Sequence, residues 1–182
     1  MDPLKIIEKY FEVGSKAYDL YVAHVSLVTA RALTIAKRVP ELKPNLQFIY
    51  EAGMLHDIGI VLVHAPGLGC EGDAPYMAHG YLGRELLEKE GLPKHALVCE
   101  RHTGVGLRTD ETQKLGLPER DMLPLTIEEE IICFADEFFT KDPNHLIEER
   151  PLPEIRKGLA RFGDAKVKMF DSWCKKFKEV ED

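Results

Sequence analysis

Apolar residues recur every three or four positions along almost the whole chain, which is the spacing of one face of an α-helix. In the segment before Pro40 this face consists of Ala17, Leu20, His24, Val28, Ala32, Ile35 and Val39. No pair of segments shows the strict alternation of apolar and polar residues that predicts paired strands. We therefore expect an all-α fold, a compact helical bundle of about six or seven helices.

Prolines and glycines divide this pattern into segments, because proline is favoured in the first turn of a helix and glycine just after its end. One helix is thus predicted from Pro44-Asn45 to near Ile58, with Gly59 as its C-cap. Two stretches, 59–78 and 105–125, interrupt the helical pattern and are long for loops, and loops of that length are usually functional. An amphipathic helix is expected at about 153–179, near the C-terminus. No stretch has the composition of a linker, so we predict a single domain over 1–182 with its motif-bearing core at about 20–140.

Composition limits the partners. The chain of 182 residues has 24 lysines and arginines against 31 aspartates and glutamates, a formal net charge of −7. A general nucleic-acid or membrane-surface binder needs a basic face, so we expect neither partner. The first residues lack the basic and apolar regions of a signal peptide, and no apolar run is long enough to span a bilayer. Four widely spaced cysteines fit reduced thiols, and the protein is expected to be cytoplasmic.

Ionisable side chains interrupt the apolar faces of the central segments. His24 lies four residues from both Leu20 and Val28, and Asp136 follows Ile132 by four. A single inward histidine is usually a hydrogen-bonded core residue, but several buried imidazoles and carboxylates without counter-charges cost several kcal/mol per ion. Buried groups of this kind generally pair or bind metals. The predicted metal ligands, called the His/Asp cluster below, are His24, His56, Asp57, His79, His102 and Asp136.

Six ligands exceed the three or four that one zinc ion takes, so the cluster predicts two metal ions. Asp57 directly follows His56 at the end of a predicted helix, so its carboxylate can bridge the two ions. Imidazole and carboxylate ligands suit divalent transition metals, and we expect iron, manganese or nickel rather than zinc or magnesium. Such a centre would attract a small anionic substrate despite the acidic composition.

The segment EAGMLHDIG, residues 51–59, is similar to the signature of the HD superfamily of metal-dependent phosphohydrolases in its HDIG form. The order His24, His56-Asp57, Asp136 matches the H…HD…D pattern of this family, and His79 and His102 match the two extra histidines of its two-metal branch. The resemblance covers about residues 20–140. HGYLG at 79–83 and HTG at 102–104 are most similar to bacterial HD-type diadenosine tetraphosphate hydrolases.

This resemblance implies a phosphohydrolase that cleaves a phosphate ester or anhydride of a small nucleotide-like substrate through a metal-bridging hydroxide, with Asp57 orienting the nucleophile. The sequence departs from the family at Ile60, where many HDIG proteins have lysine. Arg101 and the absence of a GYP motif disfavour a cyclic-di-GMP enzyme. The same six ligands also resemble those of mixed-valence di-iron oxygenases acting on a small polyol or phosphonate, and this alternative stays open.

Further residues have candidate roles with simpler alternatives. His64 is a candidate for protonating the leaving group, or a solvated loop histidine. Arg84 and Arg108 are candidate phosphate contacts, or surface charges. Thr103 precedes Gly104 at a predicted helix end, where a ligand can approach the backbone. Lys141 is expected to reach the mouth of the site, or only to complement a helix C-terminus. A homodimer is compatible with the sequence.

Overall fold

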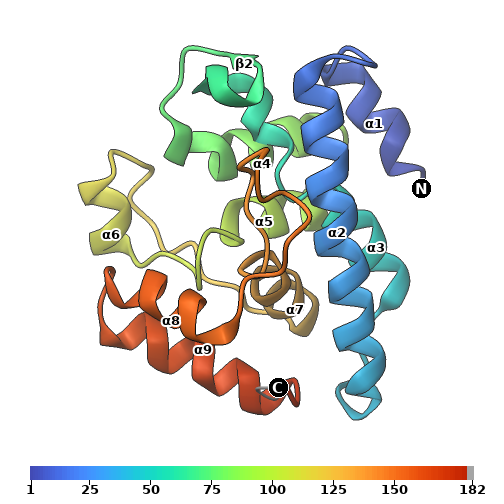
Figure 1. The fold of residues 1–182 in the computed structure, drawn as a ribbon. Coiled ribbons are helices and arrows are strands. Elements are labelled where there is room, and N and C mark those ends of the chain that lie inside the picture. The colour runs from blue at the N-terminus through green and yellow to red at the C-terminus, as the bar shows by residue number, and fades with distance from the viewer. Residues whose placement is uncertain (180–182) are drawn as a thin grey trace.

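The computed structural model describes residues 1–179 of the chain (Figure 1), and within them it contains α-helices, short 3-10 helices and one small hairpin. The α-helices are α1 (Pro3–Tyr10), α2 (Lys16–Arg38), α3 (Leu46–Leu55), α4 (His79–Lys89), α5 (Pro93–Arg101), α6 (Thr109–Lys114), α7 (Ile127–Asp136), α8 (Leu152–Ala160) and α9 (Asp164–Lys176). The 3-10 helices are η1 (Pro40–Leu42), η2 (Ile58–Leu62), η3 (Pro66–Leu68) and η4 (Tyr76–Ala78). The all-α prediction is confirmed.

Helix α2 is the longest element, and α3 and α7 pack against it. The main apolar cluster includes Phe134 of α7, whose ring contacts Phe170 and Trp173 of α9 and also Phe177. Aromatic rings bury large apolar areas, so these contacts hold the C-terminal helix on α7.

A second apolar cluster joins α1 and η2 to one half of the central helices. Each of α2, α3 and α5 contributes to both clusters; on α2, Val25 belongs to the second and Val28 to the first. His24 lies next to this boundary and is 1% exposed. His24 is therefore positioned where the two apolar clusters meet.

The count of helices exceeds the predicted six or seven, for two physical reasons. The predicted C-terminal helix is divided into α8 and α9, because Gly163 between them has a φ of +110°, outside the helical range. The predicted loop 105–125 contains the six-residue helix α6, where the Glu111 carboxylate accepts a hydrogen bond from the backbone N–H of Arg108 at 2.7 Å and so stabilises the first turn.

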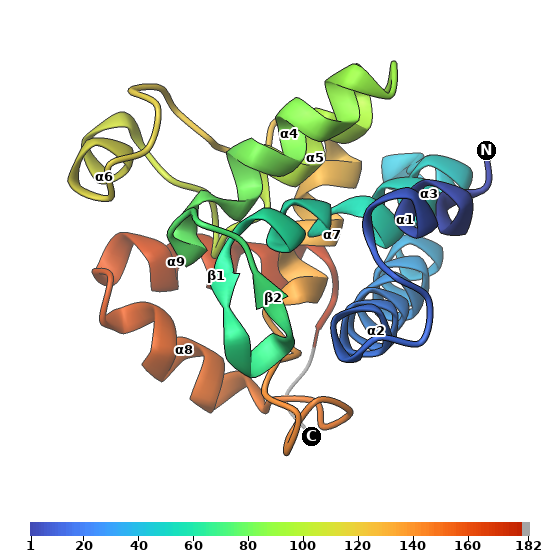
Figure 2. The ribbon, with the colours of Figure 1, turned by 90° about the horizontal axis from the view of Figure 1, so that it is seen from above.

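The predicted loop 59–78 is also more ordered than expected. It contains η2, η3 and η4, and the antiparallel strands β1 (His64–Ala65) and β2 (Cys70–Glu71), which cover one side of the molecule (Figure 2). Helix α3 ends at Leu55 rather than near Ile58, and Gly59 lies inside η2 instead of capping α3. None of the helices in residues 1–179 is long and apolar enough to cross a membrane.

The N-terminal cap of α2 gives a first testable prediction. Ser15 Oγ accepts a hydrogen bond from the backbone N–H of Tyr18 at 3.2 Å, which satisfies an otherwise free donor of the first turn. Ser15→Ala should lower the free energy of unfolding by about 1 kcal/mol and the melting temperature by roughly 3 °C. Ser26→Ala, at an exposed position inside the same helix, is the matched control. Equal melting temperatures for the two variants would contradict the capping role.

Candidate metal centre

The fold brings the six residues of the His/Asp cluster together from five elements. His24 projects from the buried face of α2, and Asp57 follows α3 in the turn before η2. The other four occupy helix ends: His56 caps the end of α3, His79 begins α4, His102 caps the end of α5 and Asp136 ends α7. Their donor atoms form three overlapping groups, each compatible with one metal ion.

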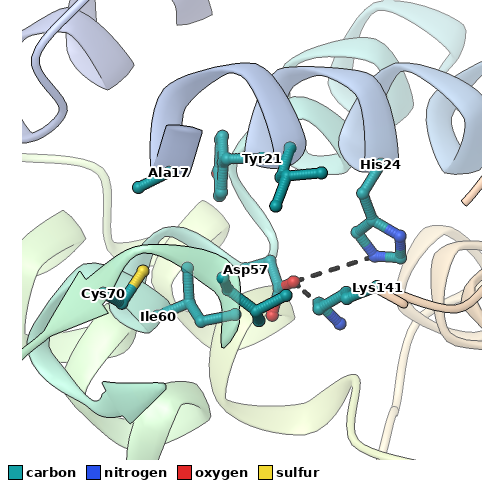
Figure 3. Close-up of a pocket in the computed structure, with 9 residues that line it drawn as sticks. Ala17, Tyr21, His24, Asp57, Ile60, Cys70 and Lys141 are labelled. Atoms are coloured by element: carbon teal, nitrogen blue, oxygen red, sulfur yellow. Dashed lines mark ion pairs between the residues drawn. The ribbon is translucent and has the colours of Figure 1, made fainter. Parts of the chain in front are cut away.

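Asp57 lies between two of these groups. Its Oδ1 is 3.4 Å from the Nε2 atoms of both His79 and His102. Its Oδ2 faces the other way, 3.7 Å from His24 Nε2 and 2.9 Å from the Lys141 ammonium; dashed lines in Figure 3 join the carboxylate to both of these side chains. One carboxylate with an oxygen toward each histidine group fits a ligand shared between two ions.

Asp136 completes the group opposite His79 and His102. Its Oδ1 is 3.0 Å from His24 Nε2 and 3.5 Å from His56 Nε2. The Asp136 side chain is 16% exposed, whereas those of His24 and His56 are at most 2% exposed. Solvent therefore reaches the centre on the Asp136 side.

Three of the four imidazoles have their tautomer fixed by the backbone. Each Nδ1 lies within hydrogen-bond distance of the carbonyl three residues earlier: His56 with Gly53 at 2.6 Å, His79 with Tyr76 at 2.7 Å, and His102 with Cys99 at 2.7 Å. A carbonyl can only accept, so each Nδ1 carries the proton and each neutral ring keeps a lone pair on Nε2. Backbone partners of this kind are typical of metal-binding histidines.

The His79 and His102 Nε2 atoms lie 3.1 Å apart. With both Nδ1 atoms donating, both Nε2 atoms of the neutral rings present lone pairs, which repel unless a cation lies between them. Two imidazoles bound to one ion at roughly 2.1 Å each, at a right angle, would have nitrogens about 3 Å apart. The observed separation fits that arrangement.

Buried polar atoms without a hydrogen bond are concentrated at the centre. Among the described residues they include His24 Nδ1 and Nε2, His56 Nε2, Asp57 Oδ1 and Oδ2, and Asp136 Oδ1. Of these, Asp57 Oδ2 has the Lys141 ammonium as an ion-pair partner, and His24 Nε2 and Asp136 Oδ1 have each other. Leaving such groups unsatisfied costs about 1–3 kcal/mol each, so a concentration of them indicates missing partners. All six atoms are of types that bind divalent transition metals. The donor set therefore fits metal ions.

The carboxylates remain charged despite their surroundings. Burial alone would raise the pKa of Asp57, but the Lys141 ammonium and the neighbouring histidines hold that pKa well below its usual range. Lys141 and His24 lower the pKa of Asp136 in the same way against burial. Burial lowers the pKa of His79 to about 4. At neutral pH the centre thus offers two anionic carboxylates and a neutral His79, the protonation states that metal binding requires.

Close backbone contact between η2 and α4 brings Asp57 to His79. A Cβ atom built on Gly59 would lie 2.0 Å from the His79 carbonyl oxygen and 2.4 Å from the backbone N of Gly83. Only glycine permits this approach. Gly59 of the HDIG segment therefore allows Asp57 and His79 to lie close together. It does not cap the end of α3, as the sequence predicted.

Two hollows of very different size adjoin the centre. A small one of about 10 Å³, lined by His24, Asp57, Lys141 and apolar side chains of α2 and the hairpin region, has room for about one water molecule. A hollow of about 750 Å³ has Tyr76 and Lys141 in its wall and extends along residues 139–161. Of these two hollows, the second has room for a substrate beside Lys141.

The remaining predicted site residues are only partly brought to the cluster. Lys141 does lie at the cluster, where its ammonium contacts Asp57. Thr103 is half-buried and lines a separate cavity next to His102. The Arg84 guanidinium is committed to Glu88 at 2.8 Å and Glu100 at 2.6 Å, so the structure does not support a phosphate contact there.

Two further predictions also receive no support. Arg108 is exposed directly before α6, and its backbone N–H donates to the Glu111 carboxylate. His64 is exposed on β1, whose pairing with β2 fixes the course of the hairpin, and no hydrogen bond or ion pair joins its side chain to the cluster in residues 1–179. Strand pairing and short capping interactions of this kind are not visible in the helical periodicity.

Two residues near the cluster, Tyr76 and Glu137, were not predicted from the sequence. The carbonyl of Tyr76 orients His79, but a carbonyl contact leaves no trace in residue type. Glu137 follows Asp136 and lines the cavity that contains Thr103. Burial and the nearby Asp136 carboxylate raise the pKa of Glu137 to about 7. A glutamate directly after a ligand position was the available signal.

The chain is similar to one protein family and to several known proteins. A family model described as HD domain matches residues 21–140. A tRNA (cytidine(56)-2'-O)-methyltransferase of Picrophilus torridus is 33% identical over 130 residues, which cover 71% of this chain and 34% of that protein. The protein of the same name from Thermoplasma volcanium is 30% identical over 79% of this chain and 38% of its own length.

An uncharacterized protein of Methanocaldococcus jannaschii is 33% identical over 72% of this chain and 64% of its own length. The chain therefore spans little more than a third of the two methyltransferases and just under two thirds of the third relative. No solved structure matches the chain significantly.

Proposed function

Since this chain belongs to the HD domain family, we propose that it is a metal-dependent phosphohydrolase acting on a small, anionic, nucleotide-like substrate. The observation that supports this most is the position of Asp57, whose two oxygens face two separate histidine groups. Two divalent ions held in this way would supply an activated water and neutralise the charge of a phosphate group. His24, His56 and Asp136 would hold one ion, His79 and His102 the other, and Asp57 both.

The names of the two methyltransferases are not carried over to this chain. The similar segment makes up 34% and 38% of those proteins, and each share is small enough to leave room for a separate methyltransferase region. A cluster of buried imidazoles and carboxylates suits metal-assisted hydrolysis. We therefore propose hydrolysis, and not methyl transfer, for this chain.

Lys141 has a defined part in this proposal. Its ammonium lies 2.9 Å from Asp57 Oδ2, in a side chain that is 18% exposed, and the larger hollow passes over it. Ile60, at the position where many HDIG proteins have lysine, is buried in the apolar cluster. A lysine from the segment after α7 thus brings positive charge to the centre, where it would attract a substrate phosphate.

The function is tested by an anaerobic screen of purified protein with manganese, nickel or ferrous iron restored. Nucleoside mono-, di- and triphosphates and dinucleoside polyphosphates are the substrates, and released phosphate or nucleotide is measured. Turnover without oxygen is the expected result. Turnover that needs both iron and oxygen would contradict hydrolysis and favour the di-iron oxygenase alternative.

Replacement of Lys141 tests the role of its charge. Lys141→Gln should lower kcat/KM about 100-fold, a loss typical for one group that stabilises charge at a reaction centre. Metal content should stay unchanged, because Lys141 is not a ligand. Lys175→Gln, on the exposed side of α9, should match the wild type. A Lys141→Gln variant with wild-type kinetics would show that the ammonium only balances the charge of Asp57.

A further inference from the structure

A cavity of about 580 Å³ lies beside the His/Asp cluster and was not predicted from the sequence. Its inner wall is formed by residues adjacent to cluster positions: Thr103 and Gly104 follow His102, and Glu137 follows Asp136. Its outer wall is the α8–α9 corner, residues 158–163. Sites for small molecules usually enclose about 300–1,000 Å³, so this cavity has room for a nucleotide-sized group.

The walls of this cavity are largely apolar. Val105, Leu107, Leu115 and Leu159 line it, and Phe162 stands at its edge. The Phe162 side chain is 74% exposed, the one phenylalanine among the described residues that is exposed to such an extent. An aromatic ring left in water at the edge of a cavity offers a face on which a planar heterocycle can stack.

Backbone hydrogen bonds fix the turn that carries this ring. The N–H of Phe162 donates to the carbonyl of Leu159 at 2.9 Å, and the N–H of Gly163 donates to that of Ala160 at 3.1 Å. The corner is thus a closed turn between two helices, and its aromatic side chain starts from a fixed backbone. A side chain on a fixed backbone loses less conformational freedom when a ligand binds than one on a mobile loop.

One cation of the corner has no partner among residues 1–179. Arg161 lines the cavity and is exposed, and no ion pair or side-chain hydrogen bond of Arg161 occurs in residues 1–179. By contrast, Arg150 pairs with Glu154 at 3.0 Å, and Lys166 with Glu111 at 2.6 Å. Arg161 also lines the 750 Å³ hollow that passes over Lys141. Its guanidinium is therefore available to an anion at the junction of the two hollows.

We propose that this cavity binds the heteroaromatic group of a phosphate-containing substrate, with Phe162 stacking on the ring and Arg161 pairing with a phosphate other than the one cleaved. The proposal rests on the proposed function and narrows its substrate class to nucleotides with more than one phosphate. The corner lies outside residues 21–140, the segment shared with the family. Selectivity for the base would thus come from a part of this chain that is not common to HD domains.

The test measures binding by calorimetry in manganese buffer with two ligands that cannot be hydrolysed: adenosine 5′-(α,β-methylene)diphosphate and methylenediphosphonate, which lacks the nucleoside. The wild type should bind the nucleotide more tightly. Phe162→Ala should weaken nucleotide binding about tenfold, the loss of one base–aromatic stack, and leave methylenediphosphonate unchanged. Phe162→Tyr should restore nucleotide binding, and Arg161→Gln should weaken both ligands.

Met169→Ala, an exposed position on α9 away from the cavity, is the control. Equal binding of the two ligands to the wild type would overturn the proposal, and so would unchanged nucleotide binding in Phe162→Ala. The proposed function is measured separately, as phosphate release from hydrolysable nucleotides. Base-dependent binding without hydrolysis would support the cavity and contradict the phosphohydrolase.

Discussion

Asp57→Asn should remove both metal ions and with them nearly all activity. The two Asp57 oxygens face different histidine groups, so this one substitution weakens both halves of the centre, whereas loss of a histidine weakens one. An amide offers one neutral oxygen, and its NH₂ group would point at imidazole lone pairs on the other side. Loss of a single charge-stabilising group costs about 100- to 1,000-fold in rate, and we expect at least that here.

Metal content by elemental analysis and thermal unfolding with and without manganese measure this effect. Metal at 100 times its dissociation constant adds about 2.7 kcal/mol to the free energy of unfolding, so the wild type should melt at a higher temperature with metal. Asp57→Asn should show no such increase. Asp110→Asn, at an exposed ion pair on α6, is the control. Wild-type metal content in Asp57→Asn would refute the shared-ligand assignment.

Gly59→Ala should be strongly destabilising, although it adds a single methyl group. The new carbon would lie 2.0 Å from the His79 carbonyl oxygen, and backbone cannot move aside as a flexible side chain can. Forcing extra volume into a packed interior costs about 1–3 kcal/mol, and we expect the upper end of that range, a fall of roughly 8 °C in melting temperature. Separating η2 from α4 also draws Asp57 away from His79, so metal affinity should fall.

Gly67→Ala provides the matched control, because nothing lies within 4 Å of a Cβ at that position and its φ is not in the left-handed region. The two glycines differ by eight positions and belong to neighbouring 3-10 helices. Chemical denaturation gives the two free energies of unfolding, and metal titration gives the affinities. Similar stability of the two variants would contradict the close-approach role of Gly59.

The cluster could be predicted from the sequence because its members conflict with the pattern around them. His24 stands on the apolar face of α2, and Asp136 follows five consecutive apolar residues of α7. A pattern of period 3.6 shows which side chains face the interior. A charged side chain in the interior must be paired or bind a metal, because burying it alone is costly. The family resemblance then supplied an order for ligands lying on separate elements.

What escaped prediction has no such periodicity. Helix α6 has six residues, too few for an apolar face to appear. The corner between α8 and α9 depends on one φ angle at Gly163, and glycine in a sequence does not say which angle it adopts. The exposure of Phe162 depends on which distant segments pack against this corner, and the sequence pattern does not show such contacts. The commitment of Arg84 to Glu100 has the same origin.

In each of three cluster histidines, the Nδ1 atom donates to the backbone carbonyl of the residue three positions earlier. A contact over three residues needs only one local turn, so it can form before distant parts of the chain meet. When the helices pack together, the imidazole rings are already oriented. Each ring then loses little rotational freedom when it binds an ion. Evolution can accordingly lengthen or replace the connecting loops without rebuilding these ligands, since the aim of each ring is encoded within four consecutive residues.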